Sequence, residues 1–261
     1  MDYGLKGKNA LVFGAGGGLG GAIAEALAAE GVCLFAADIN EDALSAVTGR
    51  IRAAGGEAHA LVWDIADKNA LERHAEAIDA SHGGVDILVN NTGGPPPTTA
   101  AGVNRDEWMR YFGSMACSVF AVTDRFLSGM RARKFGRIIT STSSGVVAPI
   151  PNLGISNAVR MSLVGWSKTL SREVARDGVT ANIILPGRIA TARIRQLDAA
   201  KAKREDRTVA EVEAESTGSI PVGRYGDPAE YGAAAAFLAS RQAGYITGST
   251  IRVDGGLIAS I

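Results

Sequence analysis

The segment that starts at residue 9 reads Asn9-Ala10-Leu11-Val12-Phe13-Gly14-Ala15-Gly16-Gly17-Gly18-Leu19-Gly20-Gly21, and residues 22–30 after it have the pattern of a helix. Glycines at a strand-to-helix turn let the backbone bend sharply. They also let a phosphate approach the helix N-terminus, whose free N–H groups and dipole favour an anion. The turn fits both G-x-x-x-G-x-G from Gly14 and G-x-G-x-x-G from Gly16, so alone it is weakly specific. Its place between a strand and a helix predicts a site for the pyrophosphate of a dinucleotide.

Short apolar runs alternate with longer stretches of helical periodicity along the whole chain. The seven expected strands are Asn9–Phe13, Val32–Ala37, Ala58–Val62, Asp86–Val89, Arg137–Thr140, Val179–Leu185 and Ser249–Val253. The helices expected between them lie near residues 19–30, 41–54, 67–82, 104–133, 154–177 and 227–240. This alternation predicts one α/β domain over residues 1–261, a doubly wound parallel sheet with right-handed crossovers and helices on both faces.

Two segments interrupt the alternation. Gly93-Gly94-Pro95-Pro96-Pro97-Thr98-Thr99 follows the fourth strand, and such a stiff loop at a strand's carboxyl end is expected to overhang a crevice. Residues 192–219 are rich in charged side chains and lie between the sixth strand and the last helix. They fit a substrate-binding lid and a solvated helical insertion equally well.

Charge and hydropathy limit the class of partner. The chain has 27 Lys and Arg against 27 Asp and Glu, so its formal net charge is zero and nothing draws it to nucleic acid or to an anionic membrane. No stretch has the ~18 consecutive apolar residues of a membrane helix, and the first residues lack a hydrophobic signal core. We expect a soluble, cytoplasmic protein that acts on a small-molecule substrate.

The cysteines and histidines predict no metal centre. Cys33 and Cys117 have neither metal-ligand nor disulfide spacing, and both are interpreted as small buried hydrophobic residues. His59, His74 and His82 are expected on the surface, where they form no catalytic or metal-binding constellation.

An acidic residue follows the second strand at the position that a dinucleotide site requires. Asp38 lies near the ~20-residue offset at which a carboxylate accepts hydrogen bonds from the adenosine ribose. Its neighbours Ala37 and Ile39 are uncharged, so no cation stands beside it to neutralise a 2′-phosphate, and the site favours NAD over NADP. Asp38 also fits the N-cap of the helix that starts at Glu41. Asp64, after the third strand, fits either a hydrogen bond to adenine or a cap of the next helix.

With these residues the chain resembles the short-chain dehydrogenase/reductase family from about Leu5 to Gly256. The matches keep the family's order and spacing along the chain. They are Gly14, Gly18 and Gly20 in the turn, Asp64-Ile65, Asn90-Asn91-Thr92-Gly93, Pro186-Gly187-Arg188-Ile189-Ala190-Thr191, Ile220-Pro221 with Gly223-Arg224, Phe237-Leu238-Ala239-Ser240, Thr247-Gly248 and Val253-Asp254-Gly255-Gly256.

The resemblance implies a fold, an assembly and a cofactor site. The fold is a seven-stranded Rossmann-like sheet with strand order 3-2-1-4-5-6-7, and the assembly is a homodimer or homotetramer joined through the helices at 104–133 and 154–177. In the family, the segment matching residues 186–191 holds the nicotinamide carboxamide. The implied cofactor residues are Gly14, Gly18, Leu19, Gly20, Asp38, Asp64, Ile65, Asn90, Asn91, Gly93, Arg160, Pro186, Gly187, Ile189 and Thr191.

The family's catalytic positions carry other residues here. Counting from the fifth strand places the family Ser at Ser143, and the family Tyr-x-x-x-Lys falls on Ser156-Asn157-Ala158-Val159-Arg160. The register set by Trp108 and Phe120 puts Met115 where the family has Asn. In the family mechanism a Tyr with a lowered pKa exchanges a proton with the substrate oxygen, while the Lys stabilises the phenolate and binds the nicotinamide ribose. A serine hydroxyl does not titrate near neutrality and a guanidinium stays protonated, so neither can take over the proton transfer.

Ser143, Ser156 and Arg160 are the candidate catalytic set. Arg160 offers a planar cation suited to a carboxylate, a phosphate or a developing oxyanion, and the serines offer hydrogen bonds. The alternative is that Arg160 only reaches the nicotinamide ribose and Ser156 only begins a helix. Tyr111, one helical turn before Met115, is the one nearby tyrosine that we consider as a proton donor, although an aromatic residue there also fits the core or an interface.

Three functions follow. The first is an NAD-dependent oxidoreductase that interconverts an alcohol and a ketone on an anionic substrate, such as a hydroxy or oxo acid or a 3-oxoacyl thioester. The second is a non-redox enzyme on the same scaffold, such as a lyase, isomerase or dehalogenase. The third is a catalytically silent NAD-binding or assembly subunit. The cofactor residues from Gly14 through Asp38 to Thr191 favour the first.

Overall fold

Seven parallel strands form one sheet in the order β3-β2-β1-β4-β5-β6-β7 in the computed structural model, which describes residues 2–260. The strands are β1 (Asn9–Phe13), β2 (Cys33–Asp38), β3 (Ala58–Val62), β4 (Ile87–Asn91), β5 (Gly136–Ser141), β6 (Val179–Pro186) and β7 (Thr250–Val253). The order confirms the expected topology. Because the winding direction reverses between β1 and β4, the carboxyl ends of these two strands open a crevice at the topological switch point.

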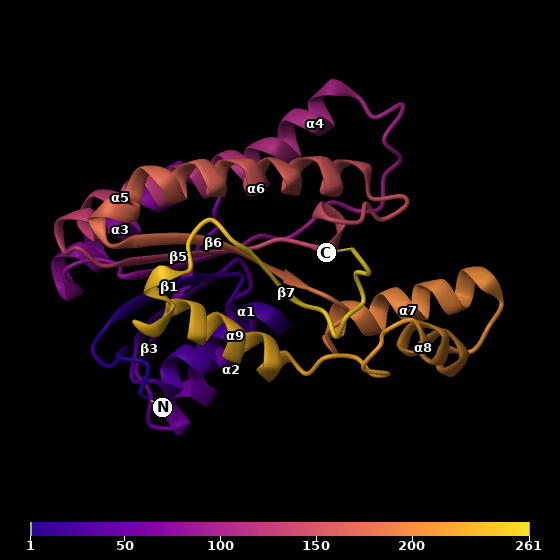
Figure 1. The fold of residues 1–261 in the computed structure, drawn as a ribbon, viewed down its shortest axis with the longest axis horizontal. Coiled ribbons are helices and arrows are strands. Elements are labelled where there is room, and N and C mark those ends of the chain that lie inside the picture. The colour runs from indigo at the N-terminus through magenta and orange to yellow at the C-terminus, as the bar shows by residue number, and fades with distance from the viewer. Residues whose placement is uncertain (1, 261) are drawn as a thin grey trace.

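Helices cover both faces of the sheet (Figure 1). One layer holds α1 (Gly18–Ala29), α2 (Glu41–Ala53) and α9 (Pro228–Ala239), and the other holds α3 (Lys68–His82), α5 (Ser118–Ala132) and α6 (Gly154–Val174). Strands buried on both faces read as nearly continuous apolar runs, which is why β1, β2 and β6 carry so few polar residues. In the first layer, α1 and α9 pack side by side and contribute Leu27 and Tyr231 to one core cluster.

The helix expected over residues 104–133 is divided into three parts. α4 (Arg105–Phe112) passes through a π-helical turn (Gly113–Cys117) into α5. A π turn inserts one extra residue into the helical repeat, and such turns are frequent at functional sites. This one buries Met115 and Ala116 against the start of α6. Apolar periodicity alone does not reveal an inserted residue, which explains why the sequence predicts one continuous helix.

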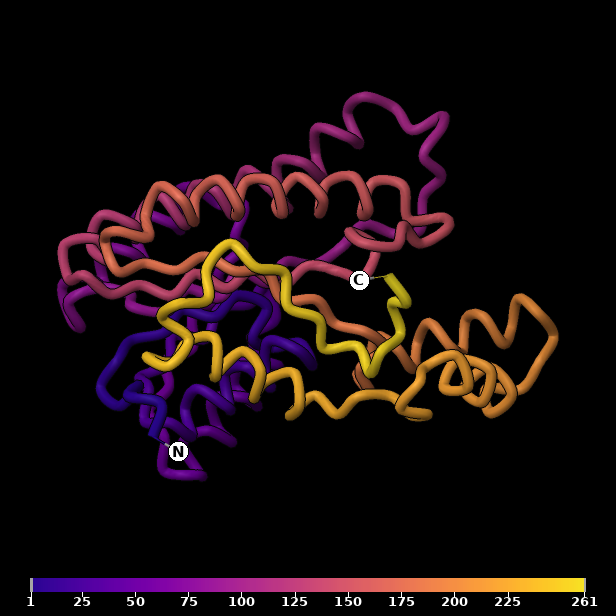
Figure 2. The backbone as a smooth tube through the Cα atoms, in the orientation of Figure 1, coloured from indigo at the N-terminus to yellow at the C-terminus, as the bar shows by residue number. Residues whose placement is uncertain are grey.

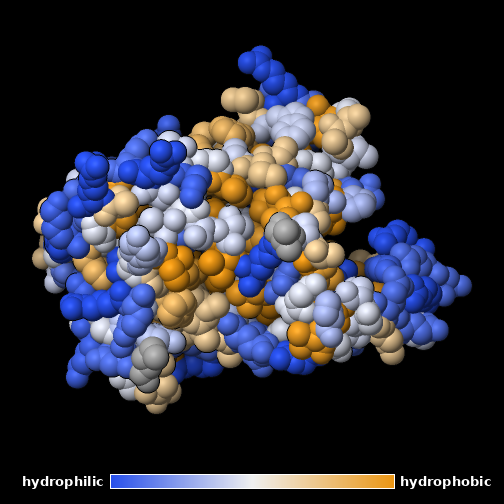
Figure 3. Space-filling model, in the orientation of Figure 1, coloured by the Kyte–Doolittle hydropathy of each residue, from blue (hydrophilic) through white to orange (hydrophobic). Residues whose placement is uncertain are grey.

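The charged segment between β6 and α9 forms two helices, α7 (Ala192–Glu205) and α8 (Val209–Gly218). They project from the body of the molecule (Figure 2), and their surface is largely hydrophilic (Figure 3). The projection is fastened at its base by Asp198, whose carboxylate accepts hydrogen bonds from Arg188 Nη1 at 3.0 Å and Tyr225 Oη at 2.7 Å. Among the described residues, none of the helices has the length and apolarity needed to cross a membrane.

Candidate active site

A cavity of about 1640 Å³ opens at the carboxyl ends of the strands. Its walls include the loops after the first six strands, β1 to β6, and α7. A pocket for one small ligand is typically ~300–1,000 Å³, so this cavity has room for a dinucleotide together with a substrate. Open parallel α/β sheets bind ligands in this place because the strand ends and the helix N-termini converge there.

The turn after β1 is so tightly packed that Gly18 and Gly20 cannot be replaced without a collision. Gly14 has φ +62°, a conformation that favours glycine. A Cβ on Gly18 would lie 2.6 Å from Thr191 Cγ2, and a Cβ on Gly20 would collide with the carbonyl oxygen of Gly14. Gly17 precedes α1 with no side-chain cap. The unpaired N–H groups of the first helical turn are therefore free to bind an anion in the cavity.

Asp38 is fixed at the edge of this turn. Its Oδ2 accepts a hydrogen bond from Gly16 N at 3.0 Å, and its Oδ1 accepts one from Asn40 N at 3.0 Å. The cap of α2 is Asn40, which accepts from Ala43 N, so the alternative of Asp38 as the helix cap is wrong. A carboxylate held in this way presents its remaining acceptor capacity to the cavity that it lines.

Asp64 is not a helix cap either. Its Oδ1 accepts a hydrogen bond from Ala66 N at 2.9 Å, while α3 is capped by Asp67. Asp64 and Ile65 line the cavity beside Trp63, a buried residue that the sequence reading did not include. The third strand thus contributes a polar and an apolar wall to the same end of the cavity as Asp38.

Of the predicted cofactor residues, all but Gly20 and Asn90 line the cavity. Gly20 packs against the backbone of Gly14 within the turn. Asn90 is 1% exposed, and its Nδ2 donates to Thr123 Oγ1 at 3.2 Å and to Thr140 Oγ1 at 3.4 Å. Its amide therefore joins β4 to β5 and α5 beneath the cavity, and it reaches a cofactor only through the position of its neighbour Asn91.

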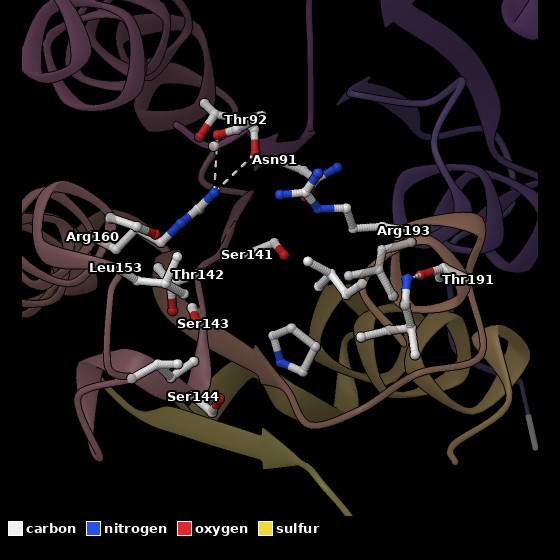
Figure 4. A pocket seen from close by; sticks show the side chains of 18 of the residues that line it. Asn91, Thr92, Ser141, Thr142, Ser143, Ser144, Leu153, Arg160, Thr191 and Arg193 are labelled. Atoms are coloured by element: carbon white, nitrogen blue, oxygen red, sulfur yellow. Dashed lines mark hydrogen bonds between the residues drawn. The ribbon is translucent and has the colours of Figure 1, made fainter. Parts of the chain in front are cut away.

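Arg160 is a buried cation in the cavity wall. Its Nη2 donates to the carbonyl oxygens of Thr92 at 3.2 Å and Gly93 at 2.9 Å (Figure 4). Burial lowers the pKa of its guanidinium to about 10, which still leaves the group charged at neutral pH. No carboxylate among the described residues forms an ion pair with Arg160. A buried charge without a counterion costs free energy, and an anion entering the cavity would remove much of that cost.

The two candidate serines line the cavity with Arg160. Ser156 lies in the first turn of α6 and is 8% exposed, whereas Ser143 follows β5 directly. Ser143 Oγ accepts a hydrogen bond from Gly145 N at 3.1 Å, which leaves its own O–H free to donate. The structure thus brings together on one wall the three residues that the sequence predicts as catalytic.

Two further residues of the sequence analysis, Met115 and Tyr111, line the cavity. Met115 is 3% exposed, packs against Ile155 and Val159, and presents an apolar side chain at the position of the family Asn. Tyr111 also lines the cavity, and its Oη accepts a hydrogen bond from Arg110 Nη2 at 2.7 Å. Because the phenol only accepts in this bond, its own O–H stays free to donate.

Several polar lining groups were missed by sequence reasoning. Thr92 and Thr142 line the cavity, and the Oγ1 of each is buried with no hydrogen-bond partner among the described residues. Buried hydroxyls are normally paired, so each is suited to a group on a bound ligand. Thr92 stands where the family segment has Ala, and this difference could have identified Thr92 as a polar lining residue from the sequence. Arg193 enters the cavity from the opposite wall, beside Thr191 (Figure 4).

The prediction that both cysteines are buried is confirmed for Cys33 and wrong for Cys117. Cys33 is 7% exposed, whereas Cys117, at the end of the π turn, is exposed. An extra residue in the helical repeat rotates the side chains that follow it, so the apolar pattern does not show which side of the turn Cys117 occupies. Neither cysteine lines the cavity.

Comparison with known proteins gives a consistent result over the whole chain. Residues 14–258 match the family described as "Enoyl-(Acyl carrier protein) reductase". The 3-oxoacyl-[acyl-carrier-protein] reductase FabG of Haemophilus influenzae is 35% identical over 261 residues, covering 98% of this chain and 100% of that protein. The enzyme of the same name from Escherichia coli is 37% identical over 255 residues, covering 97% and 98%. The crystal structure of L-sorbose reductase from Gluconobacter frateurii, complexed with NADPH and L-sorbose, superposes with a TM-score of 0.94 at 30% identity over 100% of both chains.

Proposed function

This chain belongs to the short-chain dehydrogenase/reductase family of NAD(P)-dependent oxidoreductases, and we propose that it uses NAD to interconvert an alcohol and a ketone on a substrate that carries an anionic group. The observation that supports the anionic substrate is Arg160, a buried cation that lines the cavity with no carboxylate partner among the described residues. Substrates of this class include hydroxy and oxo acids and 3-oxoacyl thioesters.

The cavity fits a dinucleotide at the end formed by the glycine turn. A Cβ at Gly16 would lie 3.0 Å from Asp38 Oδ2, so only a glycine leaves the ribose-binding carboxylate accessible beside the pyrophosphate site. The segments that border Asp38, residues 14–19 and 39–40, contain no Lys or Arg. A 2′-phosphate there would meet the Asp38 carboxylate and no cation from these two segments, which supports NAD over the NADPH found in the sorbose reductase complex.

The nicotinamide end is supported by β6. Pro186, Gly187 and Ile189 line the cavity, and Thr191 caps α7 by accepting a hydrogen bond from Ile194 N. A bound nicotinamide would supply hydride exchange with the carbon of the substrate carbinol or carbonyl. The side chains that face this end across the cavity are those of the β5–α6 wall, including Ser143 and Arg160 (Figure 4).

Arg160 can do two things in this position. Its Nη2 is used by the loop carbonyls, which fixes the plane of the guanidinium, and its Nε and Nη1 groups remain to bind a carboxylate or a developing oxyanion. A cation that does not have to move when charge develops stabilises that charge at little cost in reorganisation. Lysine lacks the planar fork of donors with which a guanidinium binds a carboxylate through two parallel hydrogen bonds.

Ser143 and Ser156 would orient the reacting oxygen by hydrogen bonds. Since neither hydroxyl titrates near neutrality, we assign the proton to solvent that reaches the open cavity rather than to a side chain. This arrangement would make the reaction less sensitive to pH between ~6 and ~9 than one that depends on a tuned phenol.

The experiment has two parts, binding and turnover. NADH and NADPH are titrated against the protein by nucleotide fluorescence, and NADH consumption is then followed by absorbance with pairs of ketones that differ only by a carboxylate. We expect NADH to bind more tightly than NADPH, and the carboxylate member of a pair to be reduced faster. Failure of both nucleotides to bind would contradict the proposal outright, and equal rates within each pair would contradict the role of Arg160.

A catalytically silent NAD-binding protein is the second candidate. It is favoured by one observation: the wall formed by Ser143, Ser156, Arg160 and Met115 contains no group that titrates near neutrality. The two candidates share the binding result and differ in turnover, so NADH binding without reduction of any ketone pair would select the silent protein.

A further inference from the structure

A second group of ligand-type side chains lies at the opposite ends of the strands. Cys33 begins β2, Glu57 immediately precedes β3, His59 is the second residue of β3, and His82 ends α3. None of the four lines the dinucleotide cavity, which opens at the carboxyl ends of the same strands. Sequence spacing predicts no metal site here because Glu57 is 24 positions after Cys33 and His82 is 23 positions after His59. The pairing of β2 with β3 brings Cys33, Glu57 and His59 together, and the packing of His82 against Phe35 adds the end of α3.

Their ligand atoms converge on one point. Cys33 Sγ, a carboxylate oxygen of Glu57, and a ring nitrogen of each histidine all lie within 4.8 Å of one another. Tetrahedral Zn²⁺, with bonds of ~2.0–2.3 Å to N, O and S, holds its ligand atoms roughly 3.5 Å apart. His59 Nε2 is already 3.2 Å from Glu57 Oε1, and His82 Nε2 is 3.8 Å from the same atom. Small side-chain rotations that move the ligand atoms by up to about 1 Å would therefore complete such a centre.

His82 is held in the form that binds a metal. Ser81 Oγ donates its hydrogen to Ala77 O at 2.6 Å, so towards His82 Nδ1, 2.7 Å away, it can only accept. The ring proton therefore sits on Nδ1, and Nε2 presents its lone pair to the group. Metal-binding histidines are usually oriented by a hydrogen bond of this kind from the other ring nitrogen.

The imidazole rings are also fixed by packing. His59 stacks on Phe35, its partner in the β2–β3 register, with 5.1 Å between ring centroids, and His82 meets the same Phe35 edge-on at 5.0 Å. The histidine side chains are only partly buried, at 40% and 26% exposure, so an ion has a path from solvent. Within the described part of the chain, no lysine or arginine forms an ion pair with Glu57, whose ion-pair partners are the two histidines.

We propose that Cys33, Glu57, His59 and His82 bind a divalent transition-metal ion of the zinc type, which joins the edge strand β3 to β2 and to the end of α3. The donor set of one thiolate, two imidazoles and one carboxylate is typical of zinc and closes all four positions to substrate, so the role of the ion is structural. Binding would place the ion between elements that are otherwise joined by one strand pair and by packing.

Co²⁺ is the probe, because a cobalt–thiolate bond gives an intense near-ultraviolet band that nitrogen and oxygen ligands do not give. Co²⁺ is titrated into the metal-stripped wild-type protein, and Zn²⁺ is then added to displace it. We expect the thiolate band to appear at a stoichiometry of one and to disappear with Zn²⁺. The variant Cys33→Ser should lose the band, whereas Cys117→Ser, at the exposed second cysteine, should keep it.

Two further variants distinguish a loss of metal binding from a loss of folding. His82→Gln keeps Cys33 in place and should weaken Co²⁺ binding, and Ser81→Ala should weaken it by about 10- to 100-fold through loss of the ring orientation. Zn²⁺ should raise the Tm of the wild type by several degrees but not that of Cys33→Ser, while all variants keep wild-type NADH binding. The absence of a thiolate band in the wild type, or a band that survives Cys33→Ser, would overturn the proposal.

Discussion

Arg160 shows how a single substitution changes what a site can do. The family position holds a lysine, whose ammonium is a compact point charge, whereas a guanidinium carries donors in a plane and can serve two partners at once. The structure uses one nitrogen of Arg160 for the backbone of residues 92–93 and leaves the others towards the cavity. The sequence alone identifies the exchange, but it cannot show that the guanidinium is buried without a carboxylate partner.

Arg160→Ala should weaken the binding of an anionic substrate far more than the binding of the nucleotide. A hydrogen-bonded contact with a charged group contributes about 1.5–3 kcal/mol, so we expect kcat/KM for the carboxylate-bearing ketone to fall by roughly tenfold to a hundredfold. Steady-state kinetics on a matched pair of ketones measures this effect. Arg176→Ala is the control, because Arg176 is exposed, follows the end of α6 and does not line the cavity. This variant should leave kcat/KM for both ketones of the pair unchanged. An equal loss for the neutral ketone would show that Arg160 does not bind the anion.

Asp38→Asn should reverse the preference for the nucleotide. The amide keeps an oxygen to accept from Gly16 N but removes the negative charge that repels a 2′-phosphate. We expect the NADH dissociation constant to rise by about tenfold and the NADPH constant to fall, since a contact with a charged group is worth ~1.5–3 kcal/mol. Fluorescence titration of both nucleotides measures the ratio, with Asp42→Asn in the exposed first turn of α2 as the control. If the ratio of the two dissociation constants did not change, Asp38 would not determine which nucleotide binds.

At the scale of the elements, strand and helix positions could be read from the sequence because buried parallel strands are short apolar runs between amphipathic helices. Two features could not be read in this way. The π turn at residues 113–117 adds one residue inside a helix without disturbing its apolar character. The group at Cys33 and His59 depends on strand pairing, which places side chains distant in sequence beside each other. Local periodicity carries neither kind of information.

Gly20→Ala should destabilise the turn between β1 and α1. The added Cβ would meet the carbonyl oxygen of Gly14 and the amide of Ala15, and neither backbone group can swing aside as a long side chain would. We expect a loss of at least about 1–3 kcal/mol in the free energy of unfolding, as for other overpacked sites. Chemical denaturation measures the loss.

Gly49→Ala is the matched control for this element. Gly49 lies inside α2, and a Cβ there would meet nothing within 4 Å. Because alanine is the better helix former by roughly 0.5–1 kcal/mol, this variant should be as stable as the wild type or more stable. If Gly20→Ala and Gly49→Ala had the same stability, the turn would not be as tightly packed as the structure indicates.

At the scale of the whole molecule, three of the exposed apolar side chains lie on α4 and α6. Met109 and Phe112 on α4 and Met161 on α6 are 60%, 37% and 46% exposed. Both helices belong to the layer that holds α3 and α5, with α4 on its outer side (Figure 1), and they correspond to the segments through which the family resemblance implies a dimer or tetramer. An exposed apolar group of this kind is typical of an association surface.

Met161→Glu should therefore convert an oligomer into a smaller species. A carboxylate in the centre of an apolar interface would be buried without a partner, which opposes association. Size-exclusion chromatography with light scattering gives the mass of the wild type and the variant. Val209→Glu, an exposed apolar position on α8, is the control and should keep the wild-type mass. A monomeric wild-type protein would refute the prediction.

The most direct test of the proposed chemistry compares the wild type with the double variant Ser156→Tyr, Arg160→Lys, which restores the family residues at both positions. NADH consumption is followed with matched pairs of ketones that differ only by a carboxylate. We predict that the wild type reduces the carboxylate member of a pair faster, and that the double variant loses this preference and gains activity on the neutral ketone. A wild type that binds NADH and reduces neither ketone, while the double variant reduces both, would contradict a catalytic role for Arg160 and identify the natural protein as silent.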